Sequence, residues 1–245
     1  MKRDWDLRSR RDAMWYIASA RRDWTQNEFF LNGEEQVEKI LTHFFKPLKF
    51  DPEKRVMLDI GCGIGRMTFA FAKTFQEVHG TDISPEMLTK ADEKAQNYTN
   101  VFLSLGNGKD LGQYDSHFFD FCFSHLVFMH IPDENIIFEY IIEIGRILKP
   151  GGLFRFDLSN YRMDNINRKI YEVIAKIYKK LGLRVNISEK RMLDHRNKIF
   201  QFETIKGAAI QREKLKSVLH SANLEPLRIT GQRTRIMLVE GRKKA

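Results

Sequence analysis

Short strand-like runs alternate with amphipathic stretches through the middle of the chain. The runs lie at 56–60, 78–81, 101–105, 118–124 and 153–158. Apolar positions at helical spacing predict helices over 67–75, over 84–96 and from Pro132 to about residue 148. Strands that alternate with helices are typical of a parallel sheet with right-handed crossovers. The run at 118–124 is apolar at nearly every position, which indicates a strand covered on both faces.

The segments on either side follow a different pattern. Residues 1–31 mix charges with aromatics and predict one or two short helices that need another surface to cover them. A further helix is expected over 34–45. After residue 160 the alternation stops, and the apolar positions of 166–181 predict an amphipathic helix. The last three predicted elements are a helix over 212–222 and strands over 227–230 and 235–240, which would pair antiparallel at the end of the sheet.

These elements predict an α/β fold with a Rossmann-like, doubly wound sheet. We expect seven mostly parallel strands with an antiparallel last strand, a helical lid at the N-terminus and a helical insertion after the fifth strand. The expected organisation is a lid over 1–50, a core formed by 51–160 and 211–245, and a cap over the substrate at 161–210.

Composition excludes several classes of protein. With 42% hydrophobic and 30% charged residues among 245, the chain can bury a core and is not disordered throughout. No apolar run reaches the roughly 18 residues of a membrane helix, and the polar first residues lack the core of an export signal. Cys62 and Cys122 are too few for a disulfide framework, and His79, His195 and His220 lack a partner at ligand spacing. We therefore expect a cytoplasmic protein without a metal site.

Charge is distributed unevenly along the chain. Residues 1–159 hold 20 lysines and arginines and 24 acids, a net charge of −4, whereas residues 160–245 hold 21 and 8, a net charge of +13. The basic part, which includes 176–198, can attract an anionic substrate or track a nucleic-acid backbone. The alternative is an ordinary solvated surface, and sparse aromatics argue against base stacking there.

The segment after the first predicted strand indicates a nucleoside site. Gly61, Gly63 and Gly65 follow the strand and precede a helix. Glycines allow a sharp turn and a close ligand approach, and the helix start offers free N–H groups. Asp82 ends the next strand 21 residues after Gly61, where a carboxylate can accept both ribose hydroxyls. Turn, helix and acid together predict a nucleoside-binding crevice at the switch point of the sheet.

Three departures from other glycine-rich motifs narrow the ligand. Arg66 stands where a dinucleotide motif has its third glycine, and the segment lacks the lysine of a P-loop. Asp59, before the turn, would repel a pyrophosphate but suits a ligand with an amino group. The spacing therefore fits S-adenosylmethionine better than NAD or ATP.

Four motifs carry a resemblance to a known family. They are LDIGCGIGR (58–66), GTDISPEML (80–88), FDFCFSHLVFMHIPD (119–133) and ILKPGGLFRFD (147–157). In this order and at this spacing, over residues 54–160, they resemble the class I S-adenosylmethionine-dependent methyltransferases of the type-11 methyltransferase-domain group.

The resemblance implies a role for individual positions. The three glycines would lie beneath the amino-acid part of S-adenosylmethionine, Asp59 near its amino group and Asp82 on the ribose. Ile83 and Met87 would pack on the adenine, and either Asn107 or Asp110 would meet the adenine amino group. The full expected cofactor set is Asp59, Gly61, Cys62, Gly63, Gly65, Arg66, Asp82, Ile83, Met87, Asn107, Gly108 and Ser124.

Acceptor chemistry is expected at the end of the fourth strand. There His125 would face the methyl acceptor as a general base, since an unperturbed histidine pKa of about 6.5 suits proton transfer. The alternative is a residue that lines the cofactor or packs. Tyr16 and Trp24 are predicted to shape the acceptor pocket, or else to form an ordinary helix core.

These expectations point to a methyltransferase that acts by in-line SN2 displacement on an O, N or C atom of a small-molecule acceptor. An anionic molecule is one alternative for this acceptor. S-adenosylhomocysteine would be the other product. A second hypothesis is an RNA or protein acceptor bound by the basic C-terminal surface. A third is a protein that holds the cofactor without transferring methyl. The acceptor and the oligomeric state stay open.

Overall fold

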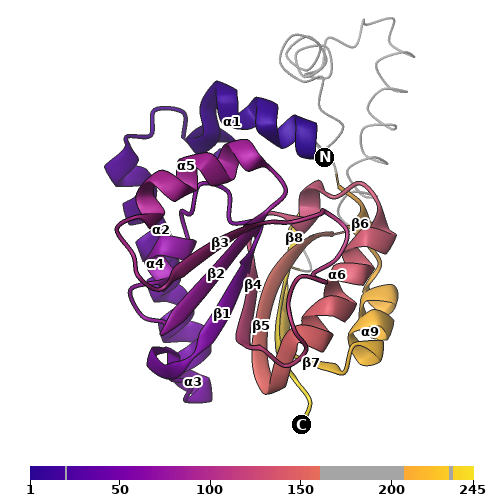
Figure 1. The fold of residues 1–245 in the computed structure, drawn as a ribbon. Helices are drawn as coiled ribbons and strands as arrows, with labels where there is room; N and C mark the ends of the chain where they lie inside the picture. The colour runs from indigo at the N-terminus through magenta and orange to yellow at the C-terminus, as the bar shows by residue number, and fades with distance from the viewer. Residues whose placement is uncertain (20, 161–206, 232–233) are drawn as a thin grey trace, which may run out of the picture.

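A mixed β-sheet forms the centre of the molecule in the computed structural model, which describes residues 1–19, 21–160, 207–231 and 234–245 (Figure 1). The strand order is β3-β2-β1-β4-β5-β8-β7, and the short β6 pairs with β5 outside this path. The strands are β1 (Val56–Ile60), β2 (Glu77–Asp82), β3 (Val101–Leu105), β4 (Phe119–Ser124), β5 (Leu148–Asn160), β6 (Ala209–Ile210), β7 (Leu224–Thr230) and β8 (Ile236–Lys243).

Strand directions confirm the predicted sheet. The first five strands pair in parallel, whereas β8 runs antiparallel to both β5 and β7. Because β1 lies between β2 and β4, the chain leaves it in opposite directions, and the topological switch point lies at its carboxyl end. The predicted fold class and the antiparallel final strand are both confirmed.

Helices cover the two faces of this sheet separately. On one face α6 (Glu134–Ile147) and α9 (Arg212–Ser221) pack with a cluster that includes Phe154 and Phe156 of β5. On the other, α2 (Gln26–Ile40) and the short α4 (Thr68–Phe71) pack around Phe121 and Phe123 of β4. Figure 1 shows these two groups on opposite sides of the sheet. Burial of β4 on both faces explains its nearly continuous apolar sequence.

Two predicted element lengths are wrong for local reasons. The helix expected over 67–75 is α-helical only at Thr68–Phe71, because Lys73 and Thr74 donate to the carbonyls three residues earlier and tighten the chain into turns. Conversely, β5 begins at Leu148 instead of 153. The Lys149–Gly152 stretch joins the strand through a register shift opposite β4, and Lys149 pairs with Asp120 there at 2.7 Å.

The N-terminal segment forms two helices, as expected. Helix α1 (Lys2–Ile17) is broken at Asp12, whose φ of −170° and ψ of 85° are not helical. Helix α2 starts at Gln26, earlier than predicted, behind a capping box between Thr25 and Glu28. It continues as a π-helical turn, Leu41–Phe45, into α3 (Lys46–Leu48).

Helix α1 lies against α5 (Pro85–Ala95) at the carboxyl ends of the strands (Figure 1). Several side-chain contacts join these helices, including one from Lys90 to the Ser9 carbonyl. Asp6 accepts a hydrogen bond from the Ser84 hydroxyl at 2.6 Å, and Arg10 pairs with Glu86 at 2.6 Å. The segment is therefore attached to the end of the sheet where the glycine turn lies.

Part of the expected organisation lies outside the described residues. The helix predicted over 166–181 and nearly all of the cap predicted over 161–210 belong to the segment 161–206. Among the residues that the structure does describe, no helix combines the length and the apolar character needed to cross a membrane.

Candidate active site

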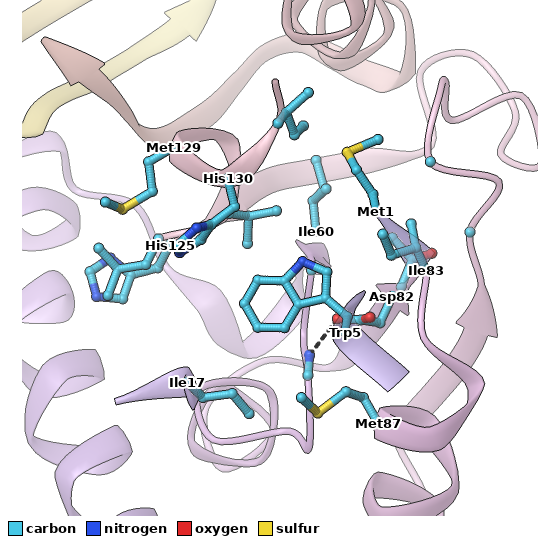
Figure 2. A pocket seen from close by; sticks show the side chains of 18 of the residues that line it. Met1, Trp5, Ile17, Ile60, Asp82, Ile83, Met87, His125, Met129 and His130 are labelled. Atoms are coloured by element: carbon cyan, nitrogen blue, oxygen red, sulfur yellow. Dashed lines mark hydrogen bonds between the residues drawn. The ribbon is translucent and has the colours of Figure 1, made fainter. Parts of the chain in front are cut away.

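A cavity of about 300 Å³ opens at the carboxyl ends of the parallel strands (Figure 2). Its wall is formed by the loops after β1, β2, β3 and β4 together with α1, a position typical of ligand sites in open α/β sheets. Nine residues singled out from the sequence line it: Tyr16, Gly61, Gly63, Asp82, Ile83, Met87, Gly108, Asp110 and His125.

The glycine turn forms the floor of this cavity and has no room for side chains. Gly61, Gly63 and Gly65 have φ values of +76°, +56° and +84°, which L-residues with a Cβ rarely adopt. A Cβ on Gly61 would lie 2.4 Å from a Val127 methyl, and one on Gly63 would lie 2.8 Å from Ile17 Cδ1. Gly61 and Gly63 therefore line the cavity with backbone alone, between the side chains of Val127 and Ile17, an arrangement that fits the close approach of a nucleoside ligand.

Asp82 is held at the cavity wall by two backbone amides. Gly63 N–H donates to Oδ2 and Ser84 N–H donates to Oδ1, both at 2.9 Å; Figure 2 shows the contact to Gly63. Burial raises the pKa of Asp82 to about 6, although these hydrogen bonds oppose the shift. The strand end and the glycine turn are thus locked together through a carboxyl group that faces the ligand space.

Several predicted cofactor residues lie behind the wall and do not line it. Asp59 is buried and accepts a hydrogen bond from Thr68 Oγ1 at 2.7 Å, and burial raises its pKa to about 6. Ser124 Oγ donates to the Ile60 carbonyl at 3.0 Å and ties β4 to β1. The remaining three are the buried Cys62, Gly65, and Arg66, whose guanidinium donates to Asn32 Oδ1 at 2.7 Å. These groups support the glycine turn from below.

The loop after β3 separates the roles of Asn107 and Asp110. Asn107 Oδ1 accepts from the backbone N–H groups of Lys109 and Asp110 at 2.8 and 3.0 Å, and its Nδ2 donates to Asp110 Oδ1 at 2.8 Å. The side chain of Asn107 is therefore used to hold the turn. Asp110 lines the cavity, and hydrogen bonds from Gly112 and Asn107 lower its pKa.

At the end of β4, His125 pairs with an acid that sequence reasoning missed. Its Nδ1 lies 2.7 Å from Oδ2 of Asp157 on β5, and Leu126 N–H donates to the other carboxylate oxygen at 2.7 Å. The available signal was an acid between apolar residues near the carboxyl end of a buried strand. Nothing in the local sequence linked it to a histidine 32 residues earlier.

The two aromatics predicted for the acceptor pocket lie in different places. Tyr16 lines the cavity. Trp24 does not; its Nε1 donates to the Ala18 carbonyl at 2.8 Å, and its ring packs edge-on against Phe29 with centroids 6.1 Å apart. Trp24 therefore helps to fix the link between α1 and α2.

Helix α1 contributes more of the wall than the sequence suggested. Trp5 lies in the cavity with its ring edge-on to His130, centroids 5.3 Å apart, and both line the wall (Figure 2). His130 is thus also a wall residue. The other lining residues not singled out are mostly apolar: Met1, Ile17, Ile60, Leu111, Leu126, Val127, Met129, Ile131 and Ile236. Among the described lining residues there is no lysine or arginine.

Comparison with known proteins identifies the domain. Residues 58–156 match the family described as a methyltransferase domain. The chain is also similar to a demethylmenaquinone methyltransferase of Staphylococcus carnosus, with 36% identity over 99 residues that cover 39% of each chain. A malonyl-[acyl-carrier protein] O-methyltransferase of Halalkalibacterium halodurans is 24% identical over 196 residues, which cover 76% of this chain and 69% of that protein.

The fold has a counterpart among solved structures. Magnesium protoporphyrin IX methyltransferase from Synechocystis, solved with bound S-adenosylhomocysteine, superposes with a TM-score of 0.58 at 14% identity over 94% of this chain and 93% of that one. Residues 58–156 thus form a methyltransferase domain with the fold of an S-adenosylmethionine-dependent methyltransferase, and the resemblance drawn from the four motifs is confirmed. The chain spans less than half the length of the first curated relatives it matches.

Proposed function

We propose that this protein transfers the methyl group of S-adenosylmethionine to a small-molecule acceptor bound in the cavity. The observation that carries the proposal is the juxtaposition of the bare glycine turn with the Asp82 carboxyl group at one cavity wall. A tight turn and an acid in this arrangement would hold an adenosyl ribose.

The described residues divide the cavity into two parts. On the cofactor side, Asp82 would accept the ribose hydroxyls, Ile83 and Met87 would pack on the adenine, and Asp110 would accept from its amino group. The glycine turn would carry the amino-acid part. When bound, S-adenosylmethionine supplies a methyl group on a sulfonium, already a strong electrophile, so that the protein has mainly to align the acceptor and exclude water.

On the acceptor side, the wall is made of Tyr16, His125, Met129 and His130. His125 is our candidate for the general base, since its ring lies in the wall and is oriented by a carboxylate. The names of two similar proteins support a small-molecule acceptor, since they refer to demethylmenaquinone and magnesium protoporphyrin IX. The proposal covers methyl transfer to an O, N or C atom of the acceptor.

We propose the organisation into lid, core and cap that the sequence predicts. Residues 1–50 act as the lid, 51–160 with 211–245 as the core, and 161–210 as a cap. The RNA or protein acceptor considered from the sequence relied on the basic segment, most of which lies outside the described residues. No described contact favours that alternative, and a cavity of about 300 Å³ favours a small acceptor.

Calorimetric titration of S-adenosylhomocysteine tests the cofactor site. Asp82→Ala removes the carboxylate that would accept hydrogen bonds from both ribose hydroxyls, and affinity for S-adenosylhomocysteine should fall about 10- to 100-fold. Asp120→Ala removes another buried carboxylate, at the opposite end of the sheet, and should bind like the wild type. Thermal unfolding of each variant separates loss of the site from loss of the fold. Unchanged affinity in a folded Asp82→Ala would contradict the proposal.

A further inference from the structure

Asp157 is placed to control the imidazole of His125. Parallel pairing sets Ser124 of β4 opposite Phe156 of β5, so that the next residues, His125 and Asp157, are brought side by side. The Asp157 side chain is only 4% exposed, whereas 31% of the His125 side chain is exposed. Each oxygen of the carboxylate has one partner, His125 Nδ1 on one side and Leu126 N–H on the other, both at 2.7 Å.

This pairing defines which ring nitrogen carries the proton. An ionised carboxylate only accepts hydrogen bonds, so the Nδ1 that faces it must be the protonated nitrogen of the neutral ring. Nε2 then holds the free lone pair. Among the described residues no other hydrogen bond reaches this ring, and its exposed edge belongs to the cavity wall.

The second contact of Asp157 holds the backbone that carries the ring. Leu126 has a φ of +59°, a left-handed conformation that a branched, non-glycine residue adopts only under constraint. Its N–H is bonded to Asp157 Oδ1. One carboxylate therefore fixes both the tautomer of His125 and the turn that aims its ring.

We infer that Asp157 is a positioning residue that keeps His125 in the Nδ1–H tautomer, so that Nε2 takes the proton of a neutral, weakly acidic hydroxyl on an otherwise apolar acceptor. The inference rests on the proposed function and specifies its acceptor class. The acceptor O–H proton passes to Nε2, the oxygen forms the new bond to the methyl carbon, and the electron pair of the broken C–S bond stays on sulfur. The imidazolium that results is stabilised by Asp157 and returns its proton to solvent.

The charges and the surface around His125 favour this acceptor class. Asp59 interacts electrostatically with His125, and the titratable groups that share its wall are the Met1 amino group, Tyr16, Asp82, Asp110, His130 and Tyr140. The described wall holds no lysine or arginine side chain that could pair with a phosphate or a carboxylate, while Asp82 and Asp110 would repel one. Ile17, Val127, Met129 and Ile236 present apolar surface instead. A hydrophobic acceptor with a neutral hydroxyl group is compatible with both the acidic residues and the apolar surface of this wall.

The tautomer can be measured by ¹⁵N NMR of histidine-labelled protein saturated with S-adenosylhomocysteine, with His125→Gln to assign the signal. The wild type should show His125 protonated at Nδ1. In Asp157→Asn the Leu126 N–H takes the single amide oxygen, so the NH₂ group faces Nδ1 and the tautomer should reverse. Asp157→Ala removes both contacts and should give a mixture of the two tautomers. Asp120→Asn is the matched control, since Asp120 is also a buried carboxylate that accepts a backbone N–H.

A wild-type ring protonated at Nε2, or an unchanged tautomer in both Asp157 variants, would overturn the positioning role. The acceptor class is tested by adding 2-naphthol or 2-naphthyl phosphate to the same sample. The naphthol should shift the His125 signals at least threefold more than the phosphate at equal concentration, and the reverse order or no shift with naphthol would overturn it. Failure of the cofactor site appears separately, as wild-type protein that does not bind S-adenosylhomocysteine in the calorimeter.

Discussion

Asp6, in the first helix, accepts a hydrogen bond at 2.6 Å from the hydroxyl of Ser84, the residue that caps α5 immediately after the Asp82 strand end. The Ser84 hydroxyl also accepts from Met87 N–H at 3.2 Å. The N-terminal helix is thus attached to the same turn that holds Asp82, the proposed ribose ligand. Any motion that opens the cavity past α1 must break this contact.

The first prediction concerns release of the cofactor product. Asp6→Ala removes the contact to Ser84 and should speed dissociation of S-adenosylhomocysteine about three- to tenfold, which corresponds to the roughly 1 kcal/mol of one such hydrogen bond. The melting temperature should change little, because Ser84 still caps α5. Stopped-flow displacement measures the rate. Asp23→Ala, which removes an exposed acid paired with Arg21, is the control, and equal rates in both variants would show that α1 does not restrain the ligand.

The second prediction is a pH dependence of cofactor affinity. Asp82 must be ionised to accept two ribose hydroxyls, and burial raises its pKa to about 6. Affinity for S-adenosylhomocysteine should therefore be constant above pH 7 and weaken up to tenfold for each unit as the pH falls below 6. In Asp82→Asn this dependence should be reduced. Titrations from pH 5 to pH 8 measure it, and an equal slope in the variant would assign the dependence to another group.

The third prediction concerns the pH dependence of stability and uses the buried Asp59. Burial raises the pKa of Asp59 to about 6, above the value of about 3.9 expected in the unfolded chain. Between these two pKa values the native state binds more protons than the unfolded state. The contribution of Asp59 to the free energy of unfolding is therefore present at low pH and lost as the pH rises through 6. The free energy of unfolding of Asp59→Asn minus that of the wild type should therefore be larger at pH 8 than at pH 5, by about 1–3 kcal/mol. Urea unfolding of the ligand-free proteins at both pH values measures this difference, and a gain independent of pH would contradict it.

The fourth prediction separates backbone strain from loss of the ligand space. Gly63→Ala and Gly151→Ala both place a Cβ on a residue with positive φ, +56° and +75°, which costs roughly 1–2 kcal/mol of stability in each case. Only the Cβ at 63 meets a neighbour, Ile17 Cδ1 at 2.8 Å, whereas that at 151 has nothing within 4 Å. Gly63→Ala should thus lose more than tenfold in S-adenosylhomocysteine affinity by calorimetry. Gly151→Ala should bind normally, and a similar loss in both would exclude a local effect on the glycine turn.

The fifth prediction tests a charge network far from the cavity. Glu240 is fully buried on β8 and pairs with Arg155 of β5 and Arg228 of β7. Its removal in Glu240→Ala leaves the mostly buried Arg155 without its carboxylate and should cost about 3–5 kcal/mol. Adding Arg155→Met should recover part of that loss, because the uncompensated charge is gone. Chemical denaturation of Glu240→Ala, of Arg155→Met and of the double variant checks this, and strictly additive losses would show that the pair is not coupled.

Much of the fold could be predicted from local pattern alone. The strands at 56–60 and 101–105 have the bounds expected, and the glycine turn and Asp82 meet at the cavity as their spacing indicates. These features depend on residues close together along the chain or on a single crossover, where periodicity and turn chemistry act directly. The same reasoning failed for the helix at 67–75, because three-residue turn hydrogen bonds end it early.

By itself the sequence determined the class of sheet, the glycine turn beside Asp82 and the position of His125 at a strand end. Only the tertiary structure decided which groups face the cavity. It set Asp157 beside His125, turned Asn107 into its own loop while Asp110 reached the wall, and brought Trp5 of the N-terminal helix into the cavity. The reason is physical: a side chain's neighbours across strands depend on register and on how helices pack, and neither is encoded in the spacing of residues along one segment.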